Sequence, residues 1–169
     1  MRLGDLVPGG GDAAITGFAL DHRKVAPGNI FGAFAGARVN GEDFAAAAVA
    51  AGAIAVVARP EASVTGALHI ADANPRAVFA QLAARFFAPF PAITVAITGT
   101  NGKTSTAELT RQLWYLAGQR AASIGTLGVT TGHDQISAGN STGGLTTPDV
   151  VTFLATMAGL AREGISHAA

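Results

Sequence analysis

The 169-residue chain contains no cysteine and few charged residues. The absence of cysteine excludes disulfides, thiolate zinc sites and cysteine nucleophiles. Charged residues make up 13% of the chain, and 11 basic residues balance 11 acidic ones, so the formal net charge is zero. A protein that binds nucleic acid by neutralising phosphates needs a basic face, so we expect no nucleic-acid partner. Aromatic residues are scarce at 7%, but an apolar fraction of 49% is enough for a core and excludes wholesale disorder.

The chain also lacks a long, strongly hydrophobic run. Its longest apolar stretch, residues 45–58, is mostly alanine and is interrupted by Gly52. A helix that crosses a bilayer needs about 20 predominantly apolar residues. The first eleven residues include Asp5 and a Pro-Gly-Gly-Gly sequence, and they contain no signal-peptide apolar region. We therefore expect a cytoplasmic protein with no membrane partner.

The segment Ala-Pro-Phe-Pro at residues 88–91 divides the chain, because two prolines so close together cannot continue a helix. Before it, β-like and helical patterns alternate. The β-like segments are 14–20, 29–34, 53–58 and 68–70, and the helical ones are 44–51 and a segment that starts at Asn74-Pro75. This alternation predicts a small N-terminal α/β domain over residues 1–88 and a second domain over 89–169.

The second domain is predicted to begin with a strand, a glycine-rich turn and a helix. The strand covers 93–97, and Leu109, Leu113 and Leu116 recur at helical spacing after the turn. A β pattern follows at 120–127, then a loop or loose hairpin at 130–144, and Thr147 before Pro148 predicts the N-cap of a last helix.

Residues 165–169 resemble the start of another strand, and the chain stops within it. A central strand that is cut short leaves backbone groups of its neighbours unpaired, so we expect the chain to be a fragment. A frayed C-terminal tail is the alternative interpretation.

The segment Thr98–Ser105, with the sequence Thr-Gly-Thr-Asn-Gly-Lys-Thr-Ser, carries the clearest chemistry. Its glycines allow the backbone to curl around an anion, and the N–H groups at the start of a helix point toward it. Lys103 would place a positive charge on the β- and γ-phosphates of ATP, and we take it as the candidate catalytic residue. The Thr104 hydroxyl would be a ligand of Mg²⁺. The residues expected to bind ATP are Gly99, Thr100, Asn101, Gly102, Lys103, Thr104 and Ser105.

Two features depart from a standard phosphate loop. Ile97 stands where the generic pattern has its first glycine, so the loop is tighter. The acidic residues after the loop, Glu108, Asp134, Asp149 and Glu163, do not follow hydrophobic strands, so we expect the Mg²⁺ site to be incomplete in this chain. The alternative to a phosphate loop at Thr98–Ser105 is a glycine-containing turn with an exposed lysine.

The loop resembles the ATP loop of the Mur ligases, cytoplasmic enzymes that add amino acids to the peptidoglycan precursor. Leu20-Asp21-His22-Arg23, Pro27–Phe31 and Gly41–Phe44 are similar to the uridine-binding domain of that family. Thr146-Thr147-Pro148-Asp149 resembles an element of the members that add the third peptide residue. The resemblance implies a small N-terminal α/β uridine-binding domain, followed by the first part of a P-loop parallel-sheet ATPase domain.

The resemblance also implies roles for residues outside the loop. Leu20 and His22 would line a uracil pocket, although the family usually has serine where His22 stands, and imidazole can instead donate a hydrogen bond or stack on a base. The remaining residues expected to bind substrate are Ala37, Arg38 and Val39 beside that pocket, and Thr146 and Thr147 at the UDP-muramoyl group.

The function that the resemblance implies is that of an ATP-dependent amide ligase. It would add a diamino acid, meso-diaminopimelate or lysine, to UDP-N-acetylmuramoyl-L-alanyl-D-glutamate through an acyl phosphate. The expected substrates and cofactors are this UDP-N-acetylmuramoyl-dipeptide, ATP with Mg²⁺ and the diamino acid, and the expected state is a monomer that is inactive as a fragment. Two alternatives stay open: a ligase that adds the terminal D-alanyl-D-alanine, and a non-catalytic nucleotide-binding module.

Overall fold

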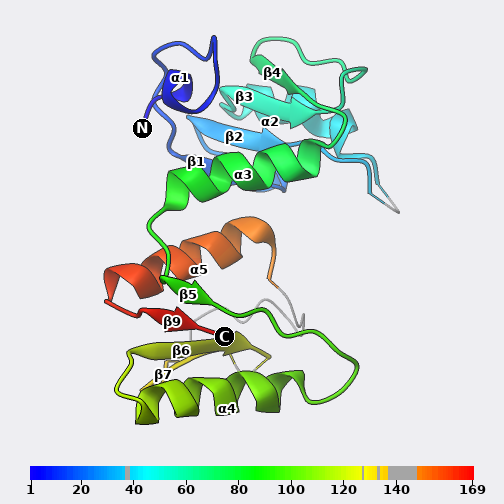
Figure 1. Cartoon of the computed structure of the whole chain (residues 1–169). Coiled ribbons are helices and arrows are strands. Elements are labelled where there is room, and N and C mark those ends of the chain that lie inside the picture. The colour runs from blue at the N-terminus through cyan, green and yellow to red at the C-terminus, as the bar shows by residue number, and fades with distance from the viewer. Residues whose placement is uncertain (37–38, 127, 133, 137–147) are drawn as a thin grey trace. The chain divides into compact units, whose positions relative to one another are not determined.

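The computed structural model describes residues 1–36, 39–126, 128–132, 134–136 and 148–169. These residues form two compact units, Met1–Phe86 and Phe87–Ala169 (Figure 1). Each unit contains a β-sheet with helices packed against it, which confirms the predicted α/β class.

The N-terminal unit is built on a four-stranded sheet in the order β1-β2-β3-β4, in which all three pairings are parallel. Its elements are α1 (Leu3–Leu6), β1 (Gly17–Ala19), the 3-10 helix η1 (His22–Lys24), β2 (Asn29–Gly32), the 3-10 helix η2 (Gly41–Phe44), α2 (Ala45–Ala50), β3 (Ala55–Ala58), β4 (Leu68–Ala71) and α3 (Pro75–Phe87). Strands β2 and β3 are buried at every position, as expected for a parallel sheet covered on both faces.

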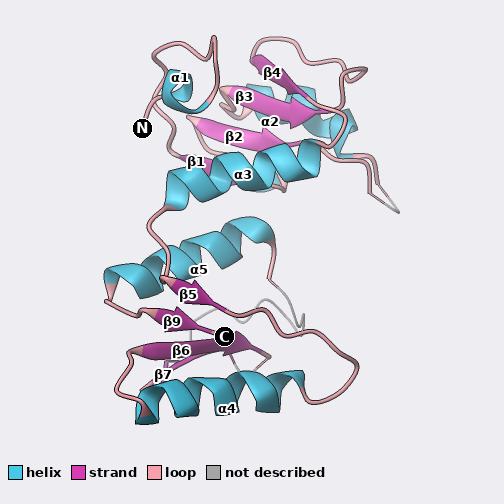
Figure 2. Ribbon diagram, in the orientation of Figure 1, coloured by secondary structure: helices cyan, strands magenta, loops and turns pink. Residues whose placement is uncertain are grey.

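Helices α2 and α3 cover opposite faces of this sheet (Figure 2). Phe31 of β2 belongs to the same buried cluster as Ala45 and Ala48 of α2. On the other face, Phe79 of α3 packs edge-on against Phe18 of β1, with ring centroids 5.3 Å apart. Side chains of a strand alternate between its two faces, so each strand supplies both layers of the core.

Local sequence signals account for where these helices start and stop. Asn74 caps α3, since its Oδ1 accepts a hydrogen bond from the Ala77 amide at 3.4 Å, and Pro75 is the first helical residue. The predicted helix 44–51 is observed as α2 over Ala45–Ala50, because Phe44 ends the preceding 3-10 helix η2 and Ala51 is the C-cap. The chain turns after it at Gly52, where φ is 106° and an added Cβ would lie 2.8 Å from Pro27 Cα.

The C-terminal unit is built on a five-stranded sheet in the order β5-β9-β6-β7-β8. Its elements are β5 (Ile93–Thr94), α4 (Lys103–Leu116), β6 (Ala121–Gly125), β7 (Gly128–Thr131), β8 (Asp134–Ile136), α5 (Val150–Arg162) and β9 (His167–Ala168). Strands β5, β9 and β6 are parallel, as predicted for the ATPase domain, whereas β7 and β8 add an antiparallel hairpin at one side.

The strands of this unit differ in length from those predicted. The strand expected at 93–97 is paired as a strand only at Ile93–Thr94, although the Val95 amide still donates to the Ala168 carbonyl at 2.9 Å. The pattern at 120–127 ends as a strand at Gly125, which leaves Thr126 outside it. The predicted strand near the C-terminus is present as β9, and it lies between β5 and β6.

Helices α4 and α5 contact opposite faces of the sheet, and strand β6 shows why (Figure 2). Ala122 and Ile124 pack with Leu160 of α5. Ser123, between them, donates a hydrogen bond to Glu108 of α4. The alternation of side chains along β6 therefore separates an apolar contact with α5 from a polar contact with α4.

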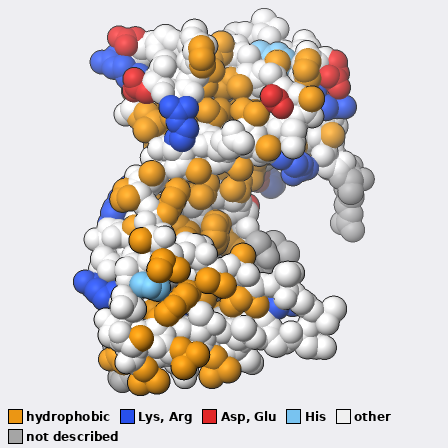
Figure 3. All heavy atoms as spheres, in the orientation of Figure 1, with side chains coloured by type: hydrophobic (Ala, Val, Ile, Leu, Met, Phe, Trp, Pro, Cys, Tyr) orange, Lys and Arg blue, Asp and Glu red, His pale blue; other side chains and the backbone are white. Residues whose placement is uncertain are grey.

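The leucine stripe of α4 does not face the sheet. Leu109, Leu113 and Leu116 are 59%, 66% and 80% exposed, while Ala107 and Arg111 of the same helix are buried. The spacing correctly predicted a helix, but a small alanine and a polar network make its contact with the sheet, so the leucines lie on the outer side. Hydrophobic side chains reach the surface over α4 in Figure 3. Within the described ranges, no helix combines the length and hydropathy needed to cross a membrane.

Phe79→Ala is expected to destabilise the N-terminal unit by about 3–5 kcal/mol, because it empties a fully buried site between α3 and the sheet. Leu113→Ala, at an exposed position of α4, is the control and should change stability by no more than about 0.5 kcal/mol. Urea unfolding followed by the amide NMR signals of each unit measures both changes. A loss below about 1 kcal/mol for Phe79→Ala would contradict the packing described here.

Candidate functional site

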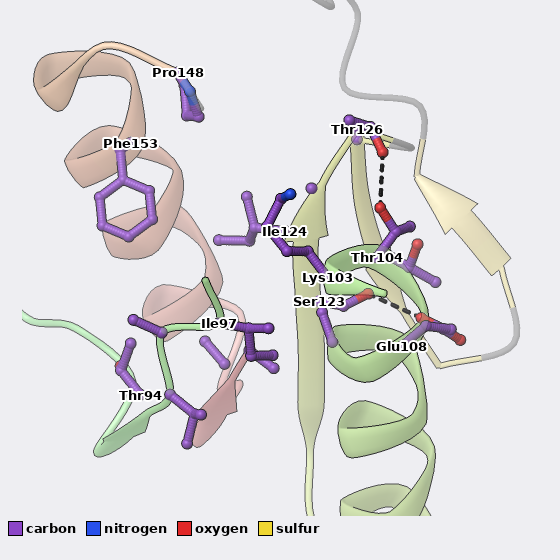
Figure 4. Close-up of a pocket in the computed structure, with 18 of the residues that line it drawn as sticks. Thr94, Ile97, Lys103, Thr104, Glu108, Ser123, Ile124, Thr126, Pro148 and Phe153 are labelled. Carbon is purple, nitrogen blue, oxygen red and sulfur yellow. Dashed lines mark hydrogen bonds between the residues drawn. The ribbon is translucent and has the colours of Figure 1, made fainter. Parts of the chain in front are cut away.

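A cavity of about 480 Å³ lies at the carboxyl edge of the parallel strands in the C-terminal unit. It is lined by the segment after β5, the carboxyl ends of β6 and β9, part of β7, and the first turns of α4 and α5. The lining residues that bear on the chemistry are Ile97, Lys103, Thr104, Glu108, Ser123, Thr126, Pro148 and Phe153 (Figure 4). In open α/β sheets, ligands bind outside the carboxyl ends of the strands, so the cavity is at the expected position for a substrate.

The predicted phosphate loop joins β5 to α4 beside this cavity. Gly102 has φ of 78° and is the N-cap residue of α4, and Gly99 has φ of 149°. An added Cβ at Gly102 would meet no atom closer than 4.0 Å, so glycine is needed there for backbone conformation rather than for space. The loop geometry therefore depends on a left-handed residue at the point where the helix begins.

The two helices that border the cavity differ at their N-termini. Asp149 caps α5, and its Oδ1 accepts hydrogen bonds from the Val151 and Thr152 amides at 3.0 and 3.1 Å. The predicted cap at Thr147 is therefore wrong, because α5 begins later than expected, at Val150. Gly102 has no side chain to cap α4, so the first-turn amides of α4 remain available to an anion.

Lys103 and Thr104 are half-buried and line the cavity, whereas Gly99, Thr100, Asn101, Gly102 and Ser105 are exposed. The Lys103 ammonium donates a hydrogen bond to the Gly99 carbonyl, so the side chain lies over its own loop. The Thr104 hydroxyl lies 3.1 Å from the hydroxyl of Thr126, which follows β6.

Glu108 holds α4 against the sheet through a polar network. Its carboxylate accepts hydrogen bonds from Arg111 Nε at 2.9 Å, from Gln112 at 3.0 Å and from Ser123 Oγ at 2.9 Å. Arg111, which is 6% exposed, also donates to the Gly132 carbonyl at 2.7 Å. The hydrogen bonds from Arg111, with smaller contributions from Gln112 and Ser123, lower the pKa of Glu108 from 4.5 to about 2. Glu108 is thus a permanently ionised, fully paired carboxylate at neutral pH, which suits a structural role better than proton transfer.

The residues predicted around a uracil pocket are only partly described. Leu20 is half-buried, and its Cδ2 would lie 2.8 Å from a Cβ added at Gly32. His22 stacks on Phe44, with ring centroids 4.3 Å apart and an interplanar angle of 3°. Val39 is 57% exposed, and Ala37 and Arg38 lie outside the described residues.

Asp21, beside His22, is held in place by its neighbour Arg23. Arg23 Nη2 donates to Asp21 Oδ2 at 2.7 Å, and Arg23 Nε donates to the same carboxylate. These side-chain hydrogen bonds hold the pKa of Asp21 well below its usual value. Asp21 and Arg23 therefore neutralise each other's charge, and their contact fixes the turn that carries His22.

Thr146 and Thr147 lie outside the described residues, so their predicted contacts are not visible. The next residue, Pro148, lines the cavity that Lys103 and Thr104 also line.

The oxygen donors around Thr104 determine whether the site fits Mg²⁺. Among the described residues, no three histidine, aspartate or glutamate side chains are grouped as metal ligands. Mg²⁺ in phosphate-transfer sites is usually held by one or two protein oxygens together with substrate phosphates and water. The Thr104 hydroxyl at the cavity wall fits one such position, and the phosphates of a nucleotide would supply others.

Glu108, Ser123 and Thr126 line the cavity but are not among the predicted site residues. Glu108 lies within the helix that follows the loop, and Ser123 and Thr126 lie within the strand pattern 120–127. The Gly-Thr-Leu-Gly sequence at 125–128 could have indicated Thr126 as a site residue. A polar residue at the carboxyl end of a parallel strand indicates the edge of the sheet where ligands bind.

Two family descriptions match the chain. The Mur ligase family, catalytic domain, matches residues 14–87, and the Mur ligase middle domain matches residues 97–169. A curated relative from Zymomonas mobilis, UDP-N-acetylmuramoyl-L-alanyl-D-glutamate–2,6-diaminopimelate ligase, is 57% identical over 98% of this chain and 34% of its own length. A relative of the same name from Bradyrhizobium diazoefficiens is 45% identical over 100% of this chain and 35% of its own length. The chain spans about a third of the length of these curated relatives.

Solved structures of ligases also match this chain, again over only part of their own length. A structure of a UDP-N-acetylmuramoyl-L-alanyl-D-glutamate–2,6-diaminopimelate ligase matches with a TM-score of 0.79 and 28% identity, over 99% of this chain and 35% of its own. MurF ligase from Thermotoga maritima, in complex with ADP, matches with a TM-score of 0.52 and 28% identity, over 63% of this chain and 25% of its own.

The Glu108 network predicts a pH-dependent stability. Because the pKa of Glu108 is lower in the folded chain than its usual 4.5, its ionised form stabilises the fold above pH 4.5, and this contribution is lost as the pH falls toward 2. Glu108→Gln should therefore destabilise the C-terminal unit more at pH 7 than at pH 3.5 in urea unfolding. Glu163→Gln, at the exposed end of α5, is the control and should have little effect at either pH. Equal destabilisation by Glu108→Gln at both pH values would contradict the ionic role.

Proposed function

Because this chain belongs to the Mur ligase family, we propose that it supplies the ATP loop and the nucleotide-sugar-binding unit of an ATP-dependent ligase. The proposed reaction joins 2,6-diaminopimelate to UDP-N-acetylmuramoyl-L-alanyl-D-glutamate, as the names of the relatives state for those proteins. The observation that carries the proposal is the junction of β5 and α4, where Gly102, Lys103 and Thr104 form an uncapped helix N-terminus at the wall of a cavity.

The proposed chemistry begins with a carboxylate of the UDP-muramoyl dipeptide. A carboxylate oxygen attacks the γ-phosphorus of ATP, the bond from this phosphorus to the β–γ bridging oxygen breaks, and ADP leaves. The amine of the diamino acid then attacks the acyl carbon of the resulting acyl phosphate, loses a proton and displaces inorganic phosphate. The protein has to hold the triphosphate, bring the two substrates together and exclude water.

The residues of this chain would act on the first of these steps. The first-turn amides of α4 and the Lys103 ammonium would bind the phosphates, and Lys103 would leave the Gly99 carbonyl to do so. The Thr104 hydroxyl would hold Mg²⁺, which when bound neutralises charge on the phosphate oxygens. The exposed loop residues Thr100, Asn101 and Ser105 would complete the cradle through their backbone amides.

The nucleotide-sugar contacts remain part of the proposal. Leu20 and His22 would line the uracil site with Ala37, Arg38 and Val39, and Thr146 and Thr147 would contact the muramoyl portion. Support comes from His22, whose flat stack on Phe44 presents an aromatic pair of the kind that bases stack on. Further support comes from Pro148, the end of the Thr-Thr-Pro element, because it lines the same cavity as Lys103 and Thr104.

The comparisons favour this reaction over the addition of D-alanyl-D-alanine. The diaminopimelate ligase structure matches nearly all of this chain with a TM-score of 0.79, whereas the MurF structure matches 63% of it with 0.52. A chimera in which this chain replaces the aligned segment of the Zymomonas mobilis relative allows a direct assay. The chimera should use the UDP-muramoyl dipeptide with diaminopimelate. Turnover only with the UDP-muramoyl tripeptide and D-alanyl-D-alanine, or no turnover despite correct folding, would contradict the proposal.

Lys103→Met tests the phosphate site. Loss of one charge-assisted contact should weaken binding of Mg²⁺-ATP to the 169-residue chain roughly 10- to 100-fold in calorimetric titrations. Lys24→Met, at an exposed lysine of the N-terminal unit, is the matched control and should bind as the unmodified chain does. Equal affinities for both variants would exclude Lys103 as a phosphate ligand.

A further inference from the structure

The contact between Thr104 and Thr126 joins two elements that are distant in sequence. The two hydroxyl oxygens are 3.1 Å apart although the residues are separated by 22 positions (Figure 4). Thr104 is the second residue of α4, and Thr126 is the first residue after β6. The proposed function uses Thr104 but gives Thr126 no role.

Two other helical threonines, Thr110 and Thr156, satisfy their hydroxyls on a carbonyl of their own helix. Thr110 donates to the Thr106 carbonyl at 2.7 Å, and Thr156 donates to the Thr152 carbonyl at 2.9 Å. The residue four positions before Thr104 is Thr100, which lies in the loop before α4 begins. The usual helical acceptor is therefore missing at Thr104, and the side chain of Thr126, which follows β6, takes its place.

The position of Thr126 is fixed from both sides. Gly125 and Gly128 pair across the β6–β7 turn, and Gly128 has φ of 88°. Three residues earlier on β6, Ser123 donates to Glu108 at 2.9 Å, and Glu108 lies one helical turn beyond Thr104. The Ser123–Glu108 contact thus ties helix α4 to strand β6 one helical turn from Thr104, and it limits the distance between the two threonines.

Either hydroxyl can donate in the Thr104–Thr126 hydrogen bond, and binding of a cation by Thr104 would set its direction. A threonine that binds a cation uses an oxygen lone pair, so its proton must point elsewhere and needs an acceptor. Thr126 Oγ1 is an acceptor at hydrogen-bond distance. Partners of this kind orient a metal ligand and raise its basicity.

We propose that Thr126 is a positioning residue, which accepts the proton of the Thr104 hydroxyl and thereby turns a lone pair of Thr104 toward a phosphate-bound divalent cation. This inference rests on the proposed function, because it assumes that Thr104 meets Mg²⁺. Thr126 then affects only the part of nucleotide binding that depends on the metal ion, and it does not contact the nucleotide.

The test compares ADP binding to the 169-residue chain in Mg²⁺ and in EDTA by calorimetric titration. Thr126→Val removes the acceptor with almost no change in shape. It should weaken binding about fivefold in Mg²⁺, the equivalent of one hydrogen bond, and leave binding in EDTA unchanged. Thr126→Ser keeps the hydroxyl and should restore the affinity in Mg²⁺. Thr110→Val, which removes a hydroxyl elsewhere on α4, is the control for loss of a helical threonine and should match the unmodified chain.

A double-mutant cycle separates positioning from direct contact. Thr104→Val should abolish the gain in affinity that Mg²⁺ produces, and adding Thr126→Val to it should have no further effect. Equal weakening by Thr126→Val in Mg²⁺ and EDTA, or no weakening in either, would overturn the inference. If the unmodified chain bound no ADP in Mg²⁺, the proposed function itself would fail and this inference with it.

Discussion

The geometry of the C-terminal unit depends on the two-residue strand β9, which pairs with β5 on one side and with β6 on the other. His167 pairs with Ile93 of β5 and with Ala121 of β6, and Ala168 pairs with Thr94 and Ala122. Strand β5, which leads into the phosphate loop, is thereby held in parallel register with β6, which leads into Thr126. The cavity exists because these carboxyl ends open at one edge of the sheet.

A second constraint fixes the phosphate loop from the helix side. Glu108, Ser123 and Arg111 tie α4 to β6 and to the β7–β8 turn, and the exposed leucines take no part in this contact. A polar network depends on direction and distance more strongly than an apolar contact does. It therefore sets the position of the first turn of α4, where Lys103 and Thr104 lie, more closely than side-chain packing could.

Features that depend on local sequence were predictable, and features that depend on distant contacts were not. The strand–loop–helix order around Gly102 and Lys103, the start of α3 at Asn74-Pro75 and the presence of a strand at β9 follow from neighbouring residues. The exposure of Leu113 and the pairing of Thr104 with Thr126 depend on how α4 rests on β6, which helical spacing does not specify. The cap of α5 was misplaced because Thr147 and Asp149 are both good N-caps, and only the start of the helix at Val150 decides between them.

The central claim is that the β5–α4 junction of this chain binds the phosphates of a nucleotide. Titration of the ¹⁵N-labelled chain with ADP and Mg²⁺, followed by amide NMR, tests it most directly. The account predicts saturable shifts in the amide signals of residues 99–105 and of Thr126, with the signals of β1–β4 unchanged. Shifts confined to the N-terminal unit, or none at saturating ADP, would contradict it.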